Sequence, residues 1–174
     1  GMTLGSLALT ANDYFRNAAG VPLSHVRHIA FGCEVPCKGC HLGCGLDSVA
    51  RLRGLYEDAS SGVKPPAAFV VETIQAEGGV NTASAEWLQG VQKLAHDYGA
   101  LFIIDDIQVG CGRTGSYFSF EGMNLDPDIV TLAKGIGGIG TPLAMNLIKP
   151  EYDDHWNPGE HTGTFRGQNL SFVA

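Results

Sequence analysis

Residues 100–106 read Ala-Leu-Phe-Ile-Ile-Asp-Asp, five apolar side chains in a row followed by two acids. A short run that is apolar at every position is typical of a strand buried on both faces of a parallel sheet. The stretch before it has helical spacing of its apolar residues, with Ser84 in the position of an N-cap and Gly99 as a C-terminal stop. The pattern therefore predicts a helix that leads directly into an internal strand.

Further apolar segments flank this pair on both sides. Predicted strands cover residues 26–31, 67–71, 129–132 and 142–148, and Val49, Leu52 and Tyr56 predict a helix over residues 47–58, with Asp47 as its cap. The run Ala67–Val71 is again continuously apolar, as expected of a strand buried on both faces. Strand, helix and strand at this spacing predict right-handed βαβ units. The expected fold class is therefore α/β, a mainly parallel sheet flanked by helices on both faces.

Composition limits the classes of function. The chain has 174 residues, 44% of them hydrophobic, enough for one globular domain. A net charge of -7 argues against nucleic acid as a partner, and no apolar run approaches the ~20 residues of a membrane span. Five cysteines without a secretory signal fit a cytoplasmic setting. The 24 glycines suggest close backbone approaches, as around a phosphate-bearing ligand.

Polar residues follow three of the predicted strands. Glu72 comes after the first, Asp105 and Asp106 after the second, and Lys134 after the third. In parallel sheets, ligands bind beyond the carboxyl ends of the strands. Two strands delivering acids and one delivering a lysine to the same edge favour an active site over a binding surface.

Lys134 stands between a buried strand and the glycine-rich stretch Gly135-Ile-Gly-Gly138. An ordinary solvated lysine is the plainer interpretation. A lysine among small residues can also be desolvated, and its amine then becomes nucleophilic toward a carbonyl. This is Schiff-base chemistry, for which pyridoxal phosphate is the commonest cofactor, and Asp105 is the candidate anion beside the pyridine nitrogen.

Two nucleotide motifs are weaker candidates. Gly110–Gly115 matches the dinucleotide fingerprint G-x-G-x-x-G, but Asp105 and Asp106 intervene after the strand and residues 117–120 lack helical periodicity. The acids also resemble the magnesium-binding acid of an ATPase, yet the chain has no G-x-x-x-x-G-K-[ST] loop. Both interpretations are therefore set aside.

Four linked motifs resemble the class III aminotransferases, pyridoxal-phosphate enzymes of fold type I. They are Val71–Gly79, Ile104–Gly110, Leu132–Gly135 and Gly163–Gly167, in the order and spacing of that family. Further segments, among them Gly110–Gly115 and Pro158–His161, are similar to the branch that acts on the L-2,4-diaminobutyrate type of diamino acid in ectoine biosynthesis. The resemblance covers the chain except for about residues 32–45.

The resemblance implies a role for each matching residue. Lys134 would form the Schiff base with pyridoxal phosphate, Asp105 would pair with the pyridinium, and Gln108 would lie by the phenolic oxygen. Thr164 would bind the cofactor phosphate of the neighbouring subunit, which implies a homodimer or a dimer of dimers. Glu72 and Glu77 match acids on the substrate side, with local backbone capping as the plainer role for Glu72.

The implied reaction moves an amino group between the terminal amine of a small diamino acid and 2-oxoglutarate. An ornithine or 4-aminobutyrate type of donor is the alternative within the family. Because family members are more than twice this long, residues 1–174 are expected to be part of the large, cofactor-binding domain. The N-terminal segment and the small C-terminal domain would then be absent, and turnover by this segment alone is not expected.

A cysteine cluster matches nothing in the family. Cys33, Cys37, Cys40 and Cys44 lie within twelve residues, in an insertion-like loop over residues 32–45. Four thiolates suit tetrahedral zinc or an iron–sulfur cluster, although structural zinc sites usually have two separated pairs. Free thiols in a surface loop are the plainer interpretation, and a non-catalytic metal-binding fragment is the alternative function. Cys111 lies apart and is expected to be a small packed residue.

Overall fold

The computed structural model describes residues 3–32, 47–164 and 166–174, and the cysteine cluster at 33–44 lies outside them. The chain divides into two compact units, Gly1–Ala30 and Phe31–Ala174. None of the helices in the described ranges is long and apolar enough to cross a membrane.

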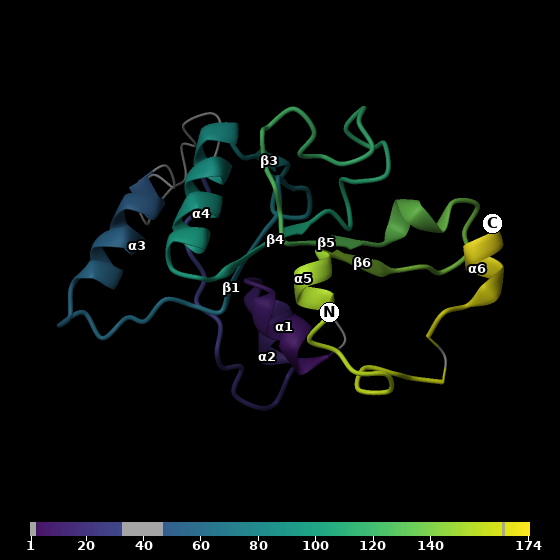
Figure 1. Ribbon diagram of the computed structural model, residues 1–174, viewed down its shortest axis with the longest axis horizontal. Coiled ribbons are helices and arrows are strands. Elements are labelled where there is room, and N and C mark those ends of the chain that lie inside the picture. The colour runs from purple at the N-terminus through teal and green to yellow at the C-terminus, as the bar shows by residue number, and fades with distance from the viewer. Residues whose placement is uncertain (1–2, 33–46, 165) are drawn as a thin grey trace. The chain divides into compact units, whose positions relative to one another are not determined.

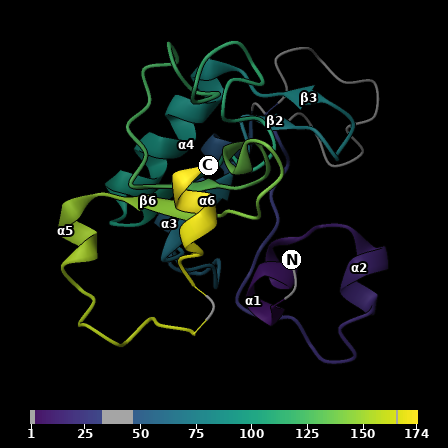
Figure 2. The same cartoon turned by 90° about the vertical axis from the view of Figure 1, so that its right-hand side faces the viewer.

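The first unit contains two short helices, α1 (Leu4–Leu9) and α2 (Asp13–Asn17), labelled in Figure 2. Thr3 and Ser6 form a reciprocal capping box at the start of α1, and Asn12 caps α2. The Arg16 guanidinium donates to the carbonyls of Ala8 and Thr10, both at 2.8 Å. These carbonyls lie at the end of α1, so a cation from α2 satisfies backbone groups that the helix leaves unpaired.

The strand predicted at residues 26–31 does not form, because a strand requires a neighbouring strand for its backbone hydrogen bonds. The described part of the first unit has helices and loops only. Phe31 and Gly32 already belong to the second unit, where the Ser84 amide donates to the Gly32 carbonyl at 3.2 Å and the Phe31 ring packs edge-on against Trp87.

The second unit is built on a four-stranded sheet of order β1-β4-β5-β6 (Figure 1). Its strands are β1 (Ala68–Val71), β4 (Leu101–Asp105), β5 (Ile129–Leu132) and β6 (Met145–Ile148). The first three are parallel, as predicted, and β6 runs antiparallel to β5. The prediction of a mainly parallel sheet flanked by helices is therefore confirmed.

Helices α3 (Ser48–Glu57) and α4 (Ala85–Asp97) lie at the positions that the apolar spacing predicts. The Ser84 hydroxyl accepts from the Trp87 amide, and Gly99 follows α4 with a φ of 68°, so both predicted end signals of α4 are confirmed. The predicted cap of α3 is wrong. Asp47 makes no side-chain capping hydrogen bond because its own backbone is already helical rather than extended.

The hydrophobic core lies between α4 and one face of the sheet. Leu88, Val91 and Leu94 of α4 pack there, each at most 1% exposed. Alternate strand residues face them, and the most buried are Phe102 and Ile104. The prediction that Ala67–Val71 is buried on both faces is wrong, because Val70 is 40% exposed. Among the described strands β1 is an edge strand, and α4 covers the opposite face.

The remaining elements are short and connect the strands. They are the hairpin β2 (Ile74–Gln75) and β3 (Asn81–Thr82), the 3-10 helix η2 (Lys134–Gly137), α5 (Pro150–Asp153) and α6 (Asn169–Val173). The hairpin follows β1 and η2 follows β5, so both lie at the carboxyl edge of the parallel strands. The predicted strand at residues 142–148 begins only at Met145.

Candidate active site

The carboxyl ends of β1, β4 and β5 bring the predicted site residues to one edge. Val71 pairs with Ile104, so Glu72 follows at the level of Asp105, the last residue of β4. Asp105 pairs in turn with Thr131, three residues before Lys134. Parallel pairing in this register therefore places Glu72, Asp105 and Lys134 at the carboxyl ends of three adjacent strands.

Asp105 is half-buried and partly tied to its own backbone. One carboxylate oxygen accepts from the Ile107 amide at 3.1 Å, an Asx-type turn that fixes the side-chain rotamer. The other oxygen has no hydrogen-bond partner within the described chain. A carboxylate held in this way can accept a further donor from a ligand at the edge.

The electrostatics of Glu72 link these side chains. Burial is the largest cause that raises the pKa of Glu72 above its ordinary value, and the negative charges of Asp105 and Glu77 raise it further. The positive charge of Lys134 opposes this shift. Three acids and the lysine therefore share one electrostatic environment at the edge.

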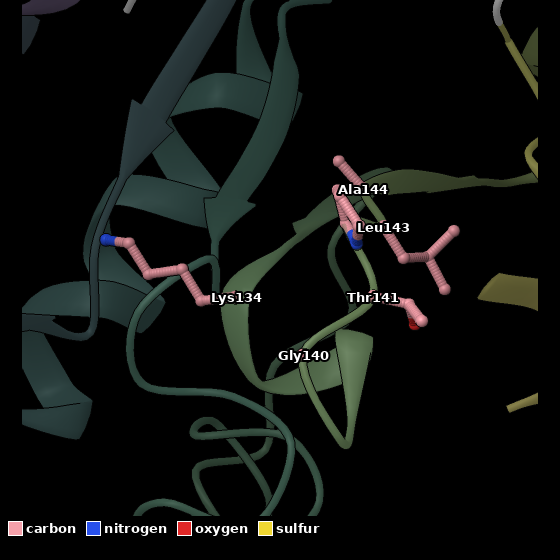
Figure 3. A pocket seen from close by; sticks show the side chains of 6 residues that line it. Lys134, Gly140, Thr141, Leu143 and Ala144 are labelled. Atoms are coloured by element: carbon pink, nitrogen blue, oxygen red, sulfur yellow. The ribbon is translucent and has the colours of Figure 1, made fainter.

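The backbone of Lys134 has the left-handed conformation, with a φ of 52°. This is uncommon for a residue with a side chain and costs roughly 1–2 kcal/mol. Figure 3 shows the side chain extended, with its amine pointing away from Thr141, Leu143 and Ala144. Lys134 and this loop line an open hollow of about 520 Å³.

Lys134 is exposed in the described chain. The desolvation expected from its small neighbours is therefore not found, since glycines and alanine cover little of a four-carbon side chain. The predicted position of the lysine is found: Lys134 follows the end of β5 after one residue, and its charge acts on Glu72.

Gln108 and Glu77 reach the edge from two loops. Glu77 is exposed in the turn of the β2–β3 hairpin, and the Gln108 amide donates to it over a long 3.4 Å. Thr164 is exposed in the stretch between α5 and α6. Within the described chain, no hydrogen bond joins Thr164 to Glu72, Asp105 or Lys134.

Three buried residues behind the edge were not predicted as a group. Thr73 and Asp106 are 0% exposed and Ser119 is 8% exposed. The Ser119 amide donates to Asp106 at 3.1 Å, and its hydroxyl lies 2.5 Å from the Thr73 hydroxyl. The sequence carries a signal for two of them only, because Thr73 and Asp106 directly follow the acids at the strand ends.

The glycine motif Gly110–Gly115 has a packing role. A Cβ atom on Gly110 would lie 2.6 Å from Oδ2 of Asp106 and 2.7 Å from its carbonyl oxygen, so a side chain has no room there. Residues 107–122 form turns and bends, and the helix that the dinucleotide fingerprint requires does not follow. No cluster of three metal-ligating side chains occurs in the part of the chain that the structure describes.

The sequence matches the family model described as Aminotransferase class-III over residues 1–174. The chain belongs to this family. It is 50% identical over 174 residues to a diaminobutyrate–2-oxoglutarate transaminase of Oceanobacillus iheyensis and 52% identical to one of Virgibacillus pantothenticus. The whole chain aligns in both cases, but it spans only 39% and 40% of those proteins.

Solved structures agree with the family and the fold. An (S)-enantioselective omega-transaminase from Thermomicrobium roseum superimposes with a TM-score of 0.74 at 28% identity, over 88% of this chain and 34% of that one. A Plasmodium yoelii ornithine aminotransferase is 34% identical, with a TM-score of 0.58 over 68% of this chain and 30% of that one. The expected fold type I architecture is therefore confirmed.

Class III aminotransferases are pyridoxal-phosphate enzymes whose substrates are an amino acid and a 2-oxo acid. The groups at the sheet edge fit this cofactor by their chemistry. A primary amine and a half-buried carboxylate both act electrostatically on Glu72, and the side-chain amide of Gln108 contacts the neighbouring acid Glu77. The hollow beside Lys134 is lined by residues 140–144 and does not include Glu72, Asp105 or Gln108.

Proposed function

We propose that this chain forms part of the cofactor-binding domain of an aminotransferase that uses the terminal amine of a small diamino acid and 2-oxoglutarate. The observation that carries the proposal is the convergence of Glu72, Asp105 and Lys134 on one sheet edge. Relatives at about 50% identity, named diaminobutyrate–2-oxoglutarate transaminases, support the diaminobutyrate type of donor. When bound, pyridoxal phosphate supplies an electron sink for the transfer.

Each side chain has a separate task in this proposal. The Lys134 amine would hold the cofactor and, as general base and acid, would move a proton between the amine-bearing carbon of the substrate and a carbon of the cofactor. The second carboxylate oxygen of Asp105 would accept a hydrogen bond from the protonated ring nitrogen of the cofactor, and the Asx turn keeps the carboxylate oriented. Gln108 would lie by the phenolic oxygen of the cofactor. Glu72 and Glu77 would lie on the side from which the substrate amine, a cation, approaches.

Assembly and setting are further parts of the proposal. Thr164 is exposed in the stretch between α5 and α6, so its hydroxyl is accessible to the cofactor phosphate of a second subunit. A site shared across a two-fold axis favours a homodimer or a dimer of dimers. A cytoplasmic setting, proposed from the odd number of cysteines in the sequence, completes the proposal.

The test of the function uses the full-length protein with added pyridoxal phosphate. Wild type is expected to develop a visible absorbance band and to convert L-2,4-diaminobutyrate faster than ornithine or 4-aminobutyrate. Lys134→Ala should lose both the band and the activity. Lys93→Ala is the matched control, because Lys93 is an exposed lysine of α4 that pairs with Asp97. A normal band and activity in Lys134→Ala would reject the assignment.

Two further measurements separate the alternatives. Thr164→Ala should weaken cofactor retention in equilibrium dialysis by about 1–3 kcal/mol, the cost of deleting a hydrogen bond to a charged group. The exposed neighbour Thr162→Ala is its control and should bind normally. Zinc or iron found by elemental analysis, without a visible band, would favour the metal-binding alternative at Cys33, Cys37, Cys40 and Cys44.

A further inference from the structure

Two strand ends of the site are joined behind it by buried hydrogen bonds. Thr73 directly follows Glu72, and Asp106 directly follows Asp105. Ser119, from the loop between β4 and β5, contacts both of them through its hydroxyl and its amide. We refer to Thr73, Ser119 and Asp106 as the clasp.

The clasp residues point away from the site. Successive side chains of an extended chain point to opposite sides, so Thr73 and Asp106 are directed inward when the acids before them face the edge. Both are fully buried, whereas Glu72 and Asp105 are partly accessible. The clasp is therefore placed to hold the two acids without touching a ligand.

Each bond in the clasp is costly to lose. A buried hydroxyl or carboxylate without a partner loses its hydration and gains nothing in return. Burial raises the pKa of Asp106, and the hydrogen bonds from Ser119 oppose that shift. Oδ1 of Asp106 is buried without a hydrogen-bond partner in the described chain. The hydrogen bond that Oδ2 accepts from the Ser119 amide therefore provides the stabilisation that this buried carboxylate receives from Ser119.

We propose that Ser119 is a positioning residue, which sets the spacing between Glu72 and Asp105 by joining Thr73 to Asp106. The inference rests on the proposed function. If Ser119 loses its hydroxyl, the hydrogen bond to Thr73 is lost. The end of β1 is then held to the end of β4 by the backbone pairing of the two strands, without the side-chain link through Ser119. Glu72 can then move relative to Asp105, and the site binds its cofactor and cationic substrate less well.

The test uses the full-length protein, four single variants and the double variant Ser119→Ala/Thr73→Val. Ser119→Ala and Thr73→Val each remove one hydroxyl from the clasp, and Thr73→Ser retains it. Ser48→Ala is the matched control for stability, because Ser48 is 7% exposed and its hydroxyl accepts from the Trp87 indole at 2.9 Å, away from the site. The readouts are the dissociation constant for pyridoxal phosphate, the pH midpoint of the visible band and the melting temperature.

Ser119→Ala and Thr73→Val are each expected to weaken cofactor binding about 5-fold, the effect of one lost hydrogen bond, and to shift the pH midpoint of the band. The double variant should be no weaker than either single variant, because both remove the same bond. Thr73→Ser should behave as wild type. Ser48→Ala should lower the melting temperature with no change in affinity or midpoint.

Two results would overturn the inference. Equal affinity and an equal midpoint in Ser119→Ala and Ser48→Ala would show that the clasp contributes stability alone. Additive losses in the double variant would show that the two hydroxyls act separately. Failure of the wild-type protein to bind pyridoxal phosphate would be a different outcome, because it rejects the proposed function itself and this inference with it.

Discussion

The imidazole of His96 lies 3.0 Å from the carboxylate of Asp128, which is 2% exposed at the opposite end of β5 from Lys134. The same carboxylate accepts from the Phe102 amide at 2.8 Å and from the Lys149 ammonium at 3.2 Å. One buried anion thus connects the end of α4, the start of β4 and the end of β6. Its partners are numerous enough to compensate for its burial.

Asp128→Asn is expected to destabilise the full-length protein by about 3 kcal/mol at pH 7, because it removes a charge that a buried network requires. Urea unfolding monitored by circular dichroism measures the change. Asp126→Asn is the control, since the Asp126 carboxylate is exposed and pairs with the same ammonium of Lys149 at 2.8 Å. A loss for Asp126→Asn as large as that for Asp128→Asn would contradict this assignment.

The stabilisation by Asp128 should depend on pH in a defined direction. Burial raises its pKa, but the hydrogen bonds from Phe102, His96 and Lys149 outweigh burial and leave the pKa below the ordinary 3.8. A lowered pKa contributes stability that is present above the unfolded value and is lost as the pH falls through the folded one. The difference between wild type and Asp128→Asn should therefore be constant near neutrality and shrink below about pH 4.

Gly110→Ala is expected to destabilise the protein by about 1–3 kcal/mol, because its Cβ would overlap with both the side chain and the carbonyl of Asp106. Gly54→Ala is the matched control, and it should change the free energy of unfolding in the opposite direction. Gly54 lies in α3 with nothing within 4 Å of its added Cβ, so alanine should stabilise that helix by up to ~1 kcal/mol. Thermal unfolding of the two variants separates the effects, and similar melting temperatures would contradict the packing role of Gly110.

Gly135→Ala should be tolerated only when Cys111 is also reduced in size. A Cβ on Gly135 would lie 3.1 Å from the Cβ of Cys111, and Cys111 itself has a φ of 57°, a conformation that glycine adopts freely. We expect Gly135→Ala to cost about 1 kcal/mol alone and clearly less in a Cys111→Gly background. A double-mutant cycle from urea unfolding measures this, and an interaction energy of zero would show that the two positions are independent.

Asp105→Asn is expected to reduce turnover at least ~100-fold in the full-length enzyme, the scale of one preorganised electrostatic group. The control is Asp13→Asn, an exposed acid of the first unit. Steady-state kinetics with L-2,4-diaminobutyrate provide the comparison. Near-normal turnover in Asp105→Asn would mean that another acid carries the role.

Much of the second unit was predictable from local patterns. The spacing of Trp87, Val91 and Leu94 specifies the buried side of α4 because helical periodicity is a property of the chain itself. The apolar runs ending at Val71, Ile104 and Leu132 specify strands, and the acids and the lysine that follow them therefore share an edge. The family motifs add the roles that chemistry alone leaves open, and these stay predictions for Gln108, Glu77 and Thr164.

Tertiary structure decided what depends on neighbours. Residues 26–31 have the composition of a strand but no partner strand, and Val70 is exposed because α4 covers the other face of β1. Ser119 is distant in sequence from Thr73, and no periodicity brings their hydroxyls together. The sequence by itself determined the elements and the order of their chemical groups, because these follow from local spacing. Burial, the clasp and the environment of Lys134 depend on long-range packing, which only the folded chain defines.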